Sequence, residues 1–150
     1  MNTLYASSVY LITPLFFVIG FLFSFSFGGV TGLILANSYI DTLLHDSYFV
    51  VGHFHYVLSL GAVYSVFASF YAYFALFDIL IIEMIGRLTF ITFFISSNLI
   101  FFNMHSLGLL GMPRRIFDYR LSFLRYNWSS SFGIIGVLIT LLLFLSSLSL

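Results

Sequence analysis

Two histidines, His53 and His55, lie within one long apolar segment of the chain. An ionisable side chain in such a segment is costly to insert into a membrane and indicates a functional site by default. On a helix, positions i and i+2 point about 200° apart, while their depths differ by only about 3 Å. The two imidazoles therefore cannot chelate one metal ion, but each can bind a separate cofactor on its own side of the helix.

Haem is the cofactor that fits this arrangement. Neutral imidazole is a common axial ligand of haem iron, and the chain is rich in aromatic residues that could line an apolar cleft for a porphyrin. A single histidine in such a position could be a hydrogen-bonded core residue, but a pair in mid-segment favours ligation. The pattern predicts that His53 and His55 are axial ligands of two different haems.

Two adjacent arginines, Arg114 and Arg115, follow Pro113 in a polar segment further along the chain. Haem carries propionate carboxylates, and arginine pairs with a carboxylate through bidentate, charge-assisted hydrogen bonds. Pro113 favours a shaped loop over a continuing helix. We therefore predict that Arg114 and Arg115 bind propionates, with anchoring at lipid headgroups as the alternative.

A neighbouring imidazole and carboxylate, His45 and Asp46, precede the paired histidines. Such a pair can bind a hard or borderline cation such as Mg²⁺ or Mn²⁺. Capping of the next helix by Asp46 or Ser47 is the alternative. His105, at the end of another apolar segment, is explained by an interfacial position, and we predict no role for it.

The composition predicts which elements position these residues. Of 150 residues, 61% are hydrophobic and 7% are charged, whereas about 25% are charged in soluble domains. Most of the surface is therefore not expected to meet water. The net charge is zero and no basic stripe exists, so no nucleic-acid partner is expected. The absence of cysteine excludes disulfides and thiolate metal sites.

Four segments are long enough to cross a bilayer as helices, which takes about 20 apolar residues each. The predicted spans are about 11–36, 49–77, 88–107 and 128–150. Because backbone polar groups in lipid must pair within their own segment, the predicted fold class is an all-α membrane protein, with one membrane domain over 1–150. Two crossings separate the His45 segment from the Arg114 segment, so both should lie at the same side of the membrane.

Three ordered motifs resemble cytochrome c oxidase subunit I, of the haem–copper oxidase family. Residues 45–59 closely resemble the signature of its tenth helix, 28–37 the end of its ninth helix, and 107–115 the loop between its eleventh and twelfth helices. The resemblance extends from about Leu11 to the C-terminus. It implies that the chain supplies four transmembrane helices of a twelve-helix haem–copper oxidase bundle.

The resemblance also implies a role for each candidate residue. His53 matches the proximal ligand of the high-spin haem a3, where oxygen reacts, and His55 matches one axial ligand of the low-spin haem a. His45 and Asp46 match the Mg²⁺ ligands. Gly52 stands where the family usually has alanine, which is a mild departure within the motif.

Arg114 and Arg115 match the arginine pair at the propionates, on the side that the family turns toward the intermembrane space of the mitochondrion. The copper of the binuclear centre would be held by the N-terminal part of the subunit. We therefore expect the isolated chain to be inactive. Because the sequence begins at Met1, we expect it to be the separate C-terminal product of a split subunit.

The implied function is electron transfer from cytochrome c through both haems to oxygen, coupled to proton translocation, in the mitochondrial inner membrane. Expected partners are the N-terminal fragment of the same subunit, subunit II with its copper centre, subunit III, accessory subunits, cytochrome c and the lipid bilayer. One alternative is a quinol oxidase or nitric oxide reductase of the same general type. Another is a non-catalytic structural fragment, which the insertion cost of about 2–3 kcal/mol per charged group argues against.

Overall fold

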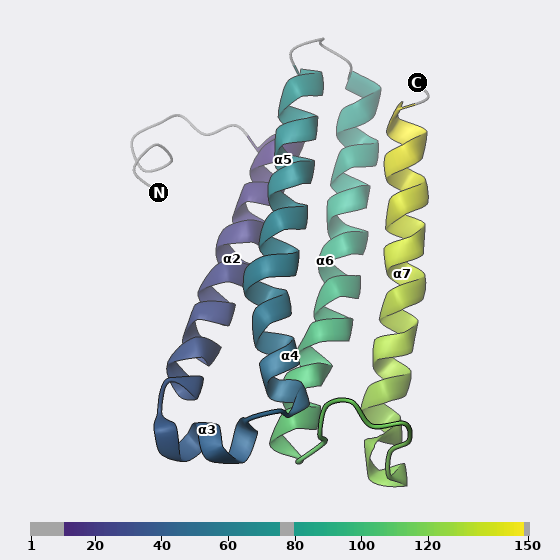
Figure 1. Ribbon diagram of the computed structural model, residues 1–150. Coiled ribbons are helices and arrows are strands. Elements are labelled where there is room, and N and C mark those ends of the chain that lie inside the picture. Colours follow the sequence, from purple (N-terminus) through teal and green to yellow (C-terminus); the bar gives the residue numbers. More distant parts are fainter. Residues whose placement is uncertain (1–10, 76–79, 149–150) are drawn as a thin grey trace.

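Four long helical rods run side by side in the computed structural model, which describes residues 11–75 and 80–148 (Figure 1). The second rod is a continuous stack of three helical segments, and short helices precede the second and fourth rods. In chain order the elements are α2 (Thr13–Leu35), α3 (Ser38–Leu44), α4 (Tyr48–Phe54), the π-helix η1 (His55–Leu60), α5 (Gly61–Ala75), α6 (Leu80–Leu109), the 3₁₀ turn η2 (Leu121–Phe123) and α7 (Leu124–Leu148). The described residues form no strand, so the predicted all-α fold class is confirmed.

All four rods are long and apolar enough to cross a membrane. The candidate spans are Thr13–Leu35, Tyr48–Tyr73, Glu83–Leu109 and Leu121–Ser147. The third and fourth helices begin at Leu80 and Leu124, before the positions that the sequence predicts. The predicted ends of the second and fourth spans, at 77 and 150, lie outside the described residues.

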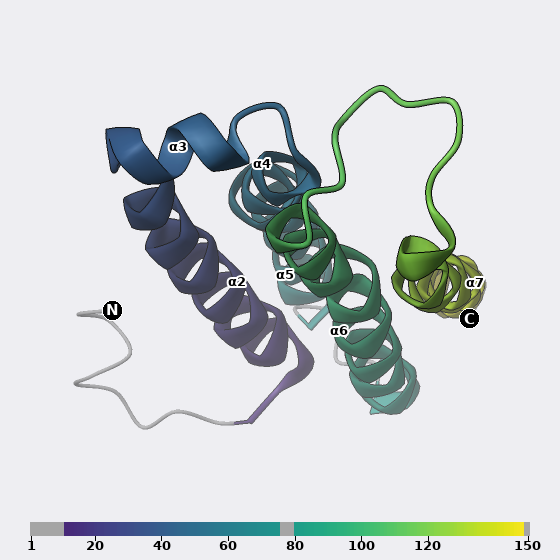
Figure 2. The ribbon, with the colours of Figure 1, turned by 90° about the horizontal axis from the view of Figure 1, so that it is seen from below.

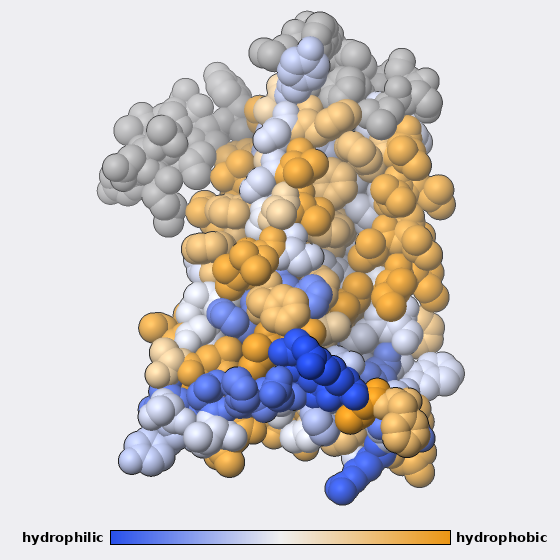
Figure 3. All heavy atoms as spheres, viewed as in Figure 1, coloured by the Kyte–Doolittle hydropathy of each residue, from blue (hydrophilic) through white to orange (hydrophobic). Residues whose placement is uncertain are grey.

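The outer surface of the rods is predominantly hydrophobic. Large apolar side chains such as Leu33 and Leu142 are 75% and 67% exposed. In water such a surface would be an aggregation hazard, whereas in a bilayer it faces lipid or other helices. Figure 3 shows hydrophobic residues over most of the visible face and a hydrophilic band at the end where α3 and the α6–α7 connection lie.

Aromatic packing joins α2 to the second and third rods. The core cluster is made of Phe17, Tyr56, Leu60, Tyr64, Tyr71 and Phe93. The ring of Phe17 stacks on Tyr71 at a centroid distance of 5.5 Å and meets Phe90 edge-on at 5.3 Å. Because lipid provides no hydrophobic driving force between helices, this close packing is what holds the rods together.

An ionic cluster ties the first turn of α2 to that of α6. The backbone N–H of Thr13 donates to Glu83 Oε1 at 2.9 Å, and Arg87 Nε donates to the same oxygen at 3.0 Å. Arg87 Nη2 also donates to the carbonyl of Leu11 at 3.0 Å. The carboxylate thus caps a helix that has no side-chain cap of its own, and it is favourably placed at two positive helix ends.

Glu83→Gln should therefore destabilise the contact between α2 and α6. Hydrogen bonds to a charged group contribute about 1.5–3 kcal/mol, roughly twice a neutral bond, so we expect a loss of about 1 kcal/mol or more. Thermal unfolding of the purified complex measures the effect. Asp118→Asn is the matched control, because Asp118 Oδ1 accepts only from the neighbouring Tyr119 N–H among the interactions of the described residues. Equal midpoints for the two variants would contradict the expectation.

Candidate histidine and cation site

The two candidate histidines lie where the second rod changes its winding. His53 belongs to the last turn of α4, and His55 is the first residue of the π-helix η1. Short π-helical turns within α-helices occur frequently at functional sites. Both side chains are half-buried, and their contacts are made to different neighbouring helices, His53 to α2 and His55 to α6.

The imidazole of His53 is held against the backbone of α2. Its Nδ1 lies 2.9 Å from the carbonyl oxygen of Gly28 and 3.0 Å from Thr31 Oγ1. A carbonyl can only accept, so Nδ1 carries the hydrogen and Nε2 keeps its lone pair. A Cβ atom on Gly32 would lie 2.9 Å from His53 Cε1, so a side chain at that position would collide with the ring.

The imidazole of His55 has the same tautomer, which is set by a hydrogen bond to the backbone of its own helix. Its Nδ1 donates to the carbonyl of Val51 at 2.7 Å, which again leaves the lone pair on Nε2. The ring stacks on Phe101 of α6 at 4.7 Å and on Phe54 at 4.5 Å. A fixed Nδ1–H and an available Nε2 are what a metal-binding histidine requires.

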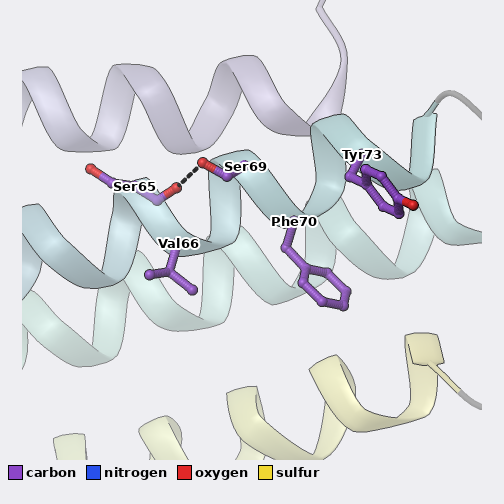
Figure 4. A pocket seen from close by; sticks show the side chains of 5 residues that line it. All are labelled: Ser65, Val66, Ser69, Phe70 and Tyr73. Atoms are coloured by element: carbon purple, nitrogen blue, oxygen red, sulfur yellow. Dashed lines mark hydrogen bonds between the residues drawn. The ribbon is translucent and has the colours of Figure 1, made fainter.

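This donor set fits haem iron. It consists of two neutral imidazoles in apolar, aromatic surroundings, each reaching the surface of the four-rod unit instead of a closed cavity. A surface pocket of about 460 Å³ lies elsewhere, on α5, where it is lined by Ser65, Val66, Ser69, Phe70 and Tyr73. Figure 4 shows that Ser65 and Ser69 in this pocket are joined by a hydrogen bond, the Ser69 hydroxyl donating to the Ser65 carbonyl.

The residues predicted to bind a cation or the haem propionates lie at one end of the molecule. The N–H of Arg114 donates to the carbonyl of Asp46 at 2.8 Å, and an antiparallel bridge pairs Ser47 with Pro113. Figure 2 views the molecule from this end, with α3 and the α6–α7 connection in front. The two polar segments thus lie at the same end of the four rods, as the count of crossings predicted.

Two side chains, those of His45 and Arg114, lie close to the carboxylate of Asp46. His45 Nε2 lies 3.7 Å from Asp46 Oδ2, and Arg114 Nη1 lies 3.7 Å from Asp46 Oδ1. Asp41, on α3, lies 3.7 Å from His45 Nδ1. The backbone of Asp46 is left-handed, with φ 57°, as is that of Arg115, with φ 58°. The structure thus brings His45, Asp46 and Arg114 together on the surface, where His45, Asp46 and Arg115 are all exposed.

The alternative of helix capping is resolved in favour of Ser47. Its Oγ accepts from the N–H of Phe49 at 3.2 Å and so caps α4, which leaves the Asp46 carboxylate available. Among the described ranges, no group of three or more histidine, aspartate and glutamate side chains could by itself hold a metal ion. Because Mg²⁺ demands octahedral coordination, a cation bound by His45 and Asp46 would need further ligands from water or another chain.

His105 packs between helices, a contact that the sequence did not predict. The side chain is only 5% exposed, and its ring meets Phe27 and Phe49 edge-on at 5.5 Å and 5.0 Å. It occupies the space that a side chain on Gly52 would fill, since a Cβ there would lie 2.8 Å from His105 Nδ1. His105 is therefore a packing element between α4 and α6, and it accounts for the glycine that precedes His53.

Thr31 was not predicted as a site residue, although it contacts His53. The only sequence signal for it is its position between Gly28 and Gly32, a spacing typical of close helix packing. Which residue of the second rod would lie against that turn could not be read from the sequence, because the contact joins positions 22 residues apart.

Comparison with known proteins identifies similar sequences along nearly the whole chain. A family model described as cytochrome c and quinol oxidase polypeptide I matches residues 1–136. A cytochrome c oxidase subunit 1 from Eremothecium gossypii is 46% identical over 145 residues, which is 96% of this chain and 27% of the relative. The proteins of the same name from Albinaria turrita and Yarrowia lipolytica are both 45% identical, over 94% and 97% of this chain and 73% and 27% of their own lengths. The chain thus spans 27% of the Eremothecium and Yarrowia relatives.

Proposed function

The chain belongs to the family of cytochrome c and quinol oxidase polypeptide I, and on this premise we propose that it is the C-terminal portion of the catalytic subunit of a cytochrome c oxidase. One observation carries the proposal: two imidazoles on one transmembrane rod each donate Nδ1–H to a backbone carbonyl and so keep Nε2 free to ligate. His53 would hold the high-spin haem a3 and His55 would hold the low-spin haem a, each through its Nε2.

Haem iron, when bound, supplies the one-electron chemistry and the place where oxygen reacts. The residues of this chain would hold the two haems and fix the orientation of the imidazoles that bind them. His53 and His55 differ by only about 3 Å in depth, so a single helix fixes the relative height of the two ligands. The stacking of His55 on Phe101 limits rotation of its ring.

Arg114 and Arg115 bind the haem propionates, and His45 with Asp46 contributes to an Mg²⁺ site at the same end. Support comes from the backbone pairing that places the Arg114 segment beside Asp46. Guanidinium groups stabilise carboxylates strongly where water is scarce. In the mitochondrial inner membrane, this end faces the intermembrane space.

The remaining parts of the core come from other chains or chain segments. The N-terminal part of the subunit supplies the copper of the binuclear centre, and subunits II and III, accessory subunits and cytochrome c complete the path from electron donor to oxygen and proton translocation. The length of the Eremothecium and Yarrowia relatives supports this proposal, as does the large exposed apolar surface. The isolated chain would be inactive.

Spectroscopy on the intact complex, purified through a tag on this chain, tests the proposed function. We expect a reduced-minus-oxidised spectrum with a haem signal, part of which shifts with carbon monoxide, and oxidation of reduced cytochrome c. A complex that oxidises a quinol instead, with the same haem signals, would support a quinol oxidase. A complex without haem would overturn the proposal in favour of a structural fragment.

A further inference from the structure

A buried hydroxyl on α2 lies beside the imidazole that we assign to the high-spin haem. Thr31 is 6% exposed, and its Oγ1 donates to the carbonyl of Gly28 at 2.8 Å. The same oxygen lies 3.0 Å from His53 Nδ1, which also donates to the Gly28 carbonyl at 2.9 Å. Because the hydroxyl hydrogen is directed to Gly28, the lone pairs of Thr31 are left to accept from His53.

From this geometry we propose that Thr31 is a positioning residue for His53. It is a second acceptor for the Nδ1–H and so increases the electron donation of Nε2 to the haem iron. The inference rests on the proposed function, because it takes His53 as an axial ligand. A hydrogen bond to the far nitrogen of a ligating histidine fixes the tautomer and ring orientation and raises the basicity of the ligand. The Thr31 hydroxyl, the Gly28 carbonyl and the His53 imidazole thus form one hydrogen-bonded cluster in which each donor has an acceptor.

The surface of α2 around Thr31 is shaped to bring His53 close. Glycines flank the threonine one turn apart, and both are tightly packed. A Cβ on Gly28 would lie 2.6 Å from Val57 Cγ2, and one on Gly32 would lie 2.9 Å from His53 Cε1. The imidazole of His53 therefore packs directly against the backbone of Gly32. Among the described residues, Thr31 has the one side chain of this turn that forms a hydrogen bond with His53.

A purely structural role for the hydroxyl is the competing explanation. Threonine in a helix commonly bonds a carbonyl one turn back, and Thr89 in α6 does so, its Oγ1 donating to the Ile85 carbonyl at 2.8 Å. Thr89 is as deeply buried, at 0% exposed, but has no hydrogen bond with a histidine in the described part of the chain. Thr89→Val is thus a matched control for Thr31→Val.

The experiment compares the intact complex carrying Thr31→Val, Thr31→Ser, Thr89→Val or His53→Ala. The readouts are the iron–histidine stretching frequency of the reduced high-spin haem, measured by resonance Raman, and its midpoint potential. Thr31→Val should lower the frequency and raise the potential, because a less basic imidazole stabilises oxidised iron less. We expect about a two- to tenfold change in the equilibrium constant for reduction, which is about 20–60 mV at 59 mV per tenfold for one electron.

Thr31→Ser should keep the wild-type frequency and potential, and Thr89→Val should change neither. An assembled Thr31→Val complex with wild-type frequency and potential would overturn the inference and leave the hydroxyl a structural role. If valine prevents assembly, Thr31→Ala is measured in its place against the same two outcomes. His53→Ala separates this inference from the proposed function: if the carbon-monoxide-reactive haem persists in that variant, the ligand assignment itself is wrong.

Discussion

His53→Ala should remove the carbon-monoxide-reactive haem from the purified complex, while His55→Ala should disturb mainly the low-spin signal. Each variant deletes one of the two side chains that we propose as haem ligands, and the imidazole that remains contacts a different helix. Loss of a residue that only supports a ligand already costs about 10–100-fold in metal affinity, so loss of the ligand itself should cost more. Reduced-minus-oxidised spectra with and without carbon monoxide distinguish the two signals.

His105→Ala is the matched control for these two variants. His105 is buried between α4 and α6 and packs against Gly52, next to His53. Its removal should lower the stability of the complex but leave both haem signals in the protein that assembles. If His53→Ala and His55→Ala assemble with unchanged haem spectra, the two histidines are structural and the haem ligands lie in another chain.

Gly108→Ala should prevent α6 from packing on α4 and so reduce assembly of the chain severely. A Cβ atom at this position would overlap the backbone nitrogen of Phe49 and lie 2.5 Å from its Cα. Backbone atoms cannot rotate away, so one of the two helices would have to move. Overpacking costs about 1–3 kcal/mol where side chains can adjust, and we expect more than that here.

Gly29→Ala is the control, because a Cβ on Gly29 would meet nothing within 4 Å. Replacing glycine by alanine within a helix favours the helix by about 1 kcal/mol, so this variant should be neutral or slightly stabilised. The amount of tagged chain recovered in the complex and its thermal midpoint measure both effects. Equal recovery of the two variants would show that α6 can move away from α4 at Gly108 without a loss of stability, which would contradict the expectation.

The sequence was sufficient to predict that the chain is a membrane protein, that it has four transmembrane rods and which family it belongs to. These follow from local properties: long apolar segments, the scarcity of charge, and motifs that are contiguous in the chain. The placement of both polar segments at one end followed from counting crossings. The roles of His53, His55, His45, Asp46, Arg114 and Arg115 stay predictions, although the hydrogen bonds from Nδ1 of His53 and His55 to backbone carbonyls suit ligation through Nε2.

Only the tertiary structure decided what each of these side chains contacts. The packing of His105 against Gly52 was not predicted, and Thr31 was not expected to accept from His53. The change to a π-helix at His55 also lies within an apolar run that reads as uninterrupted α-helix. Hydrophobicity determines that a segment crosses the membrane, but it is nearly equal around these helices. The rotation and depth of one helix against another depend instead on the shapes of side chains far apart in the sequence, and only the packed structure reveals them.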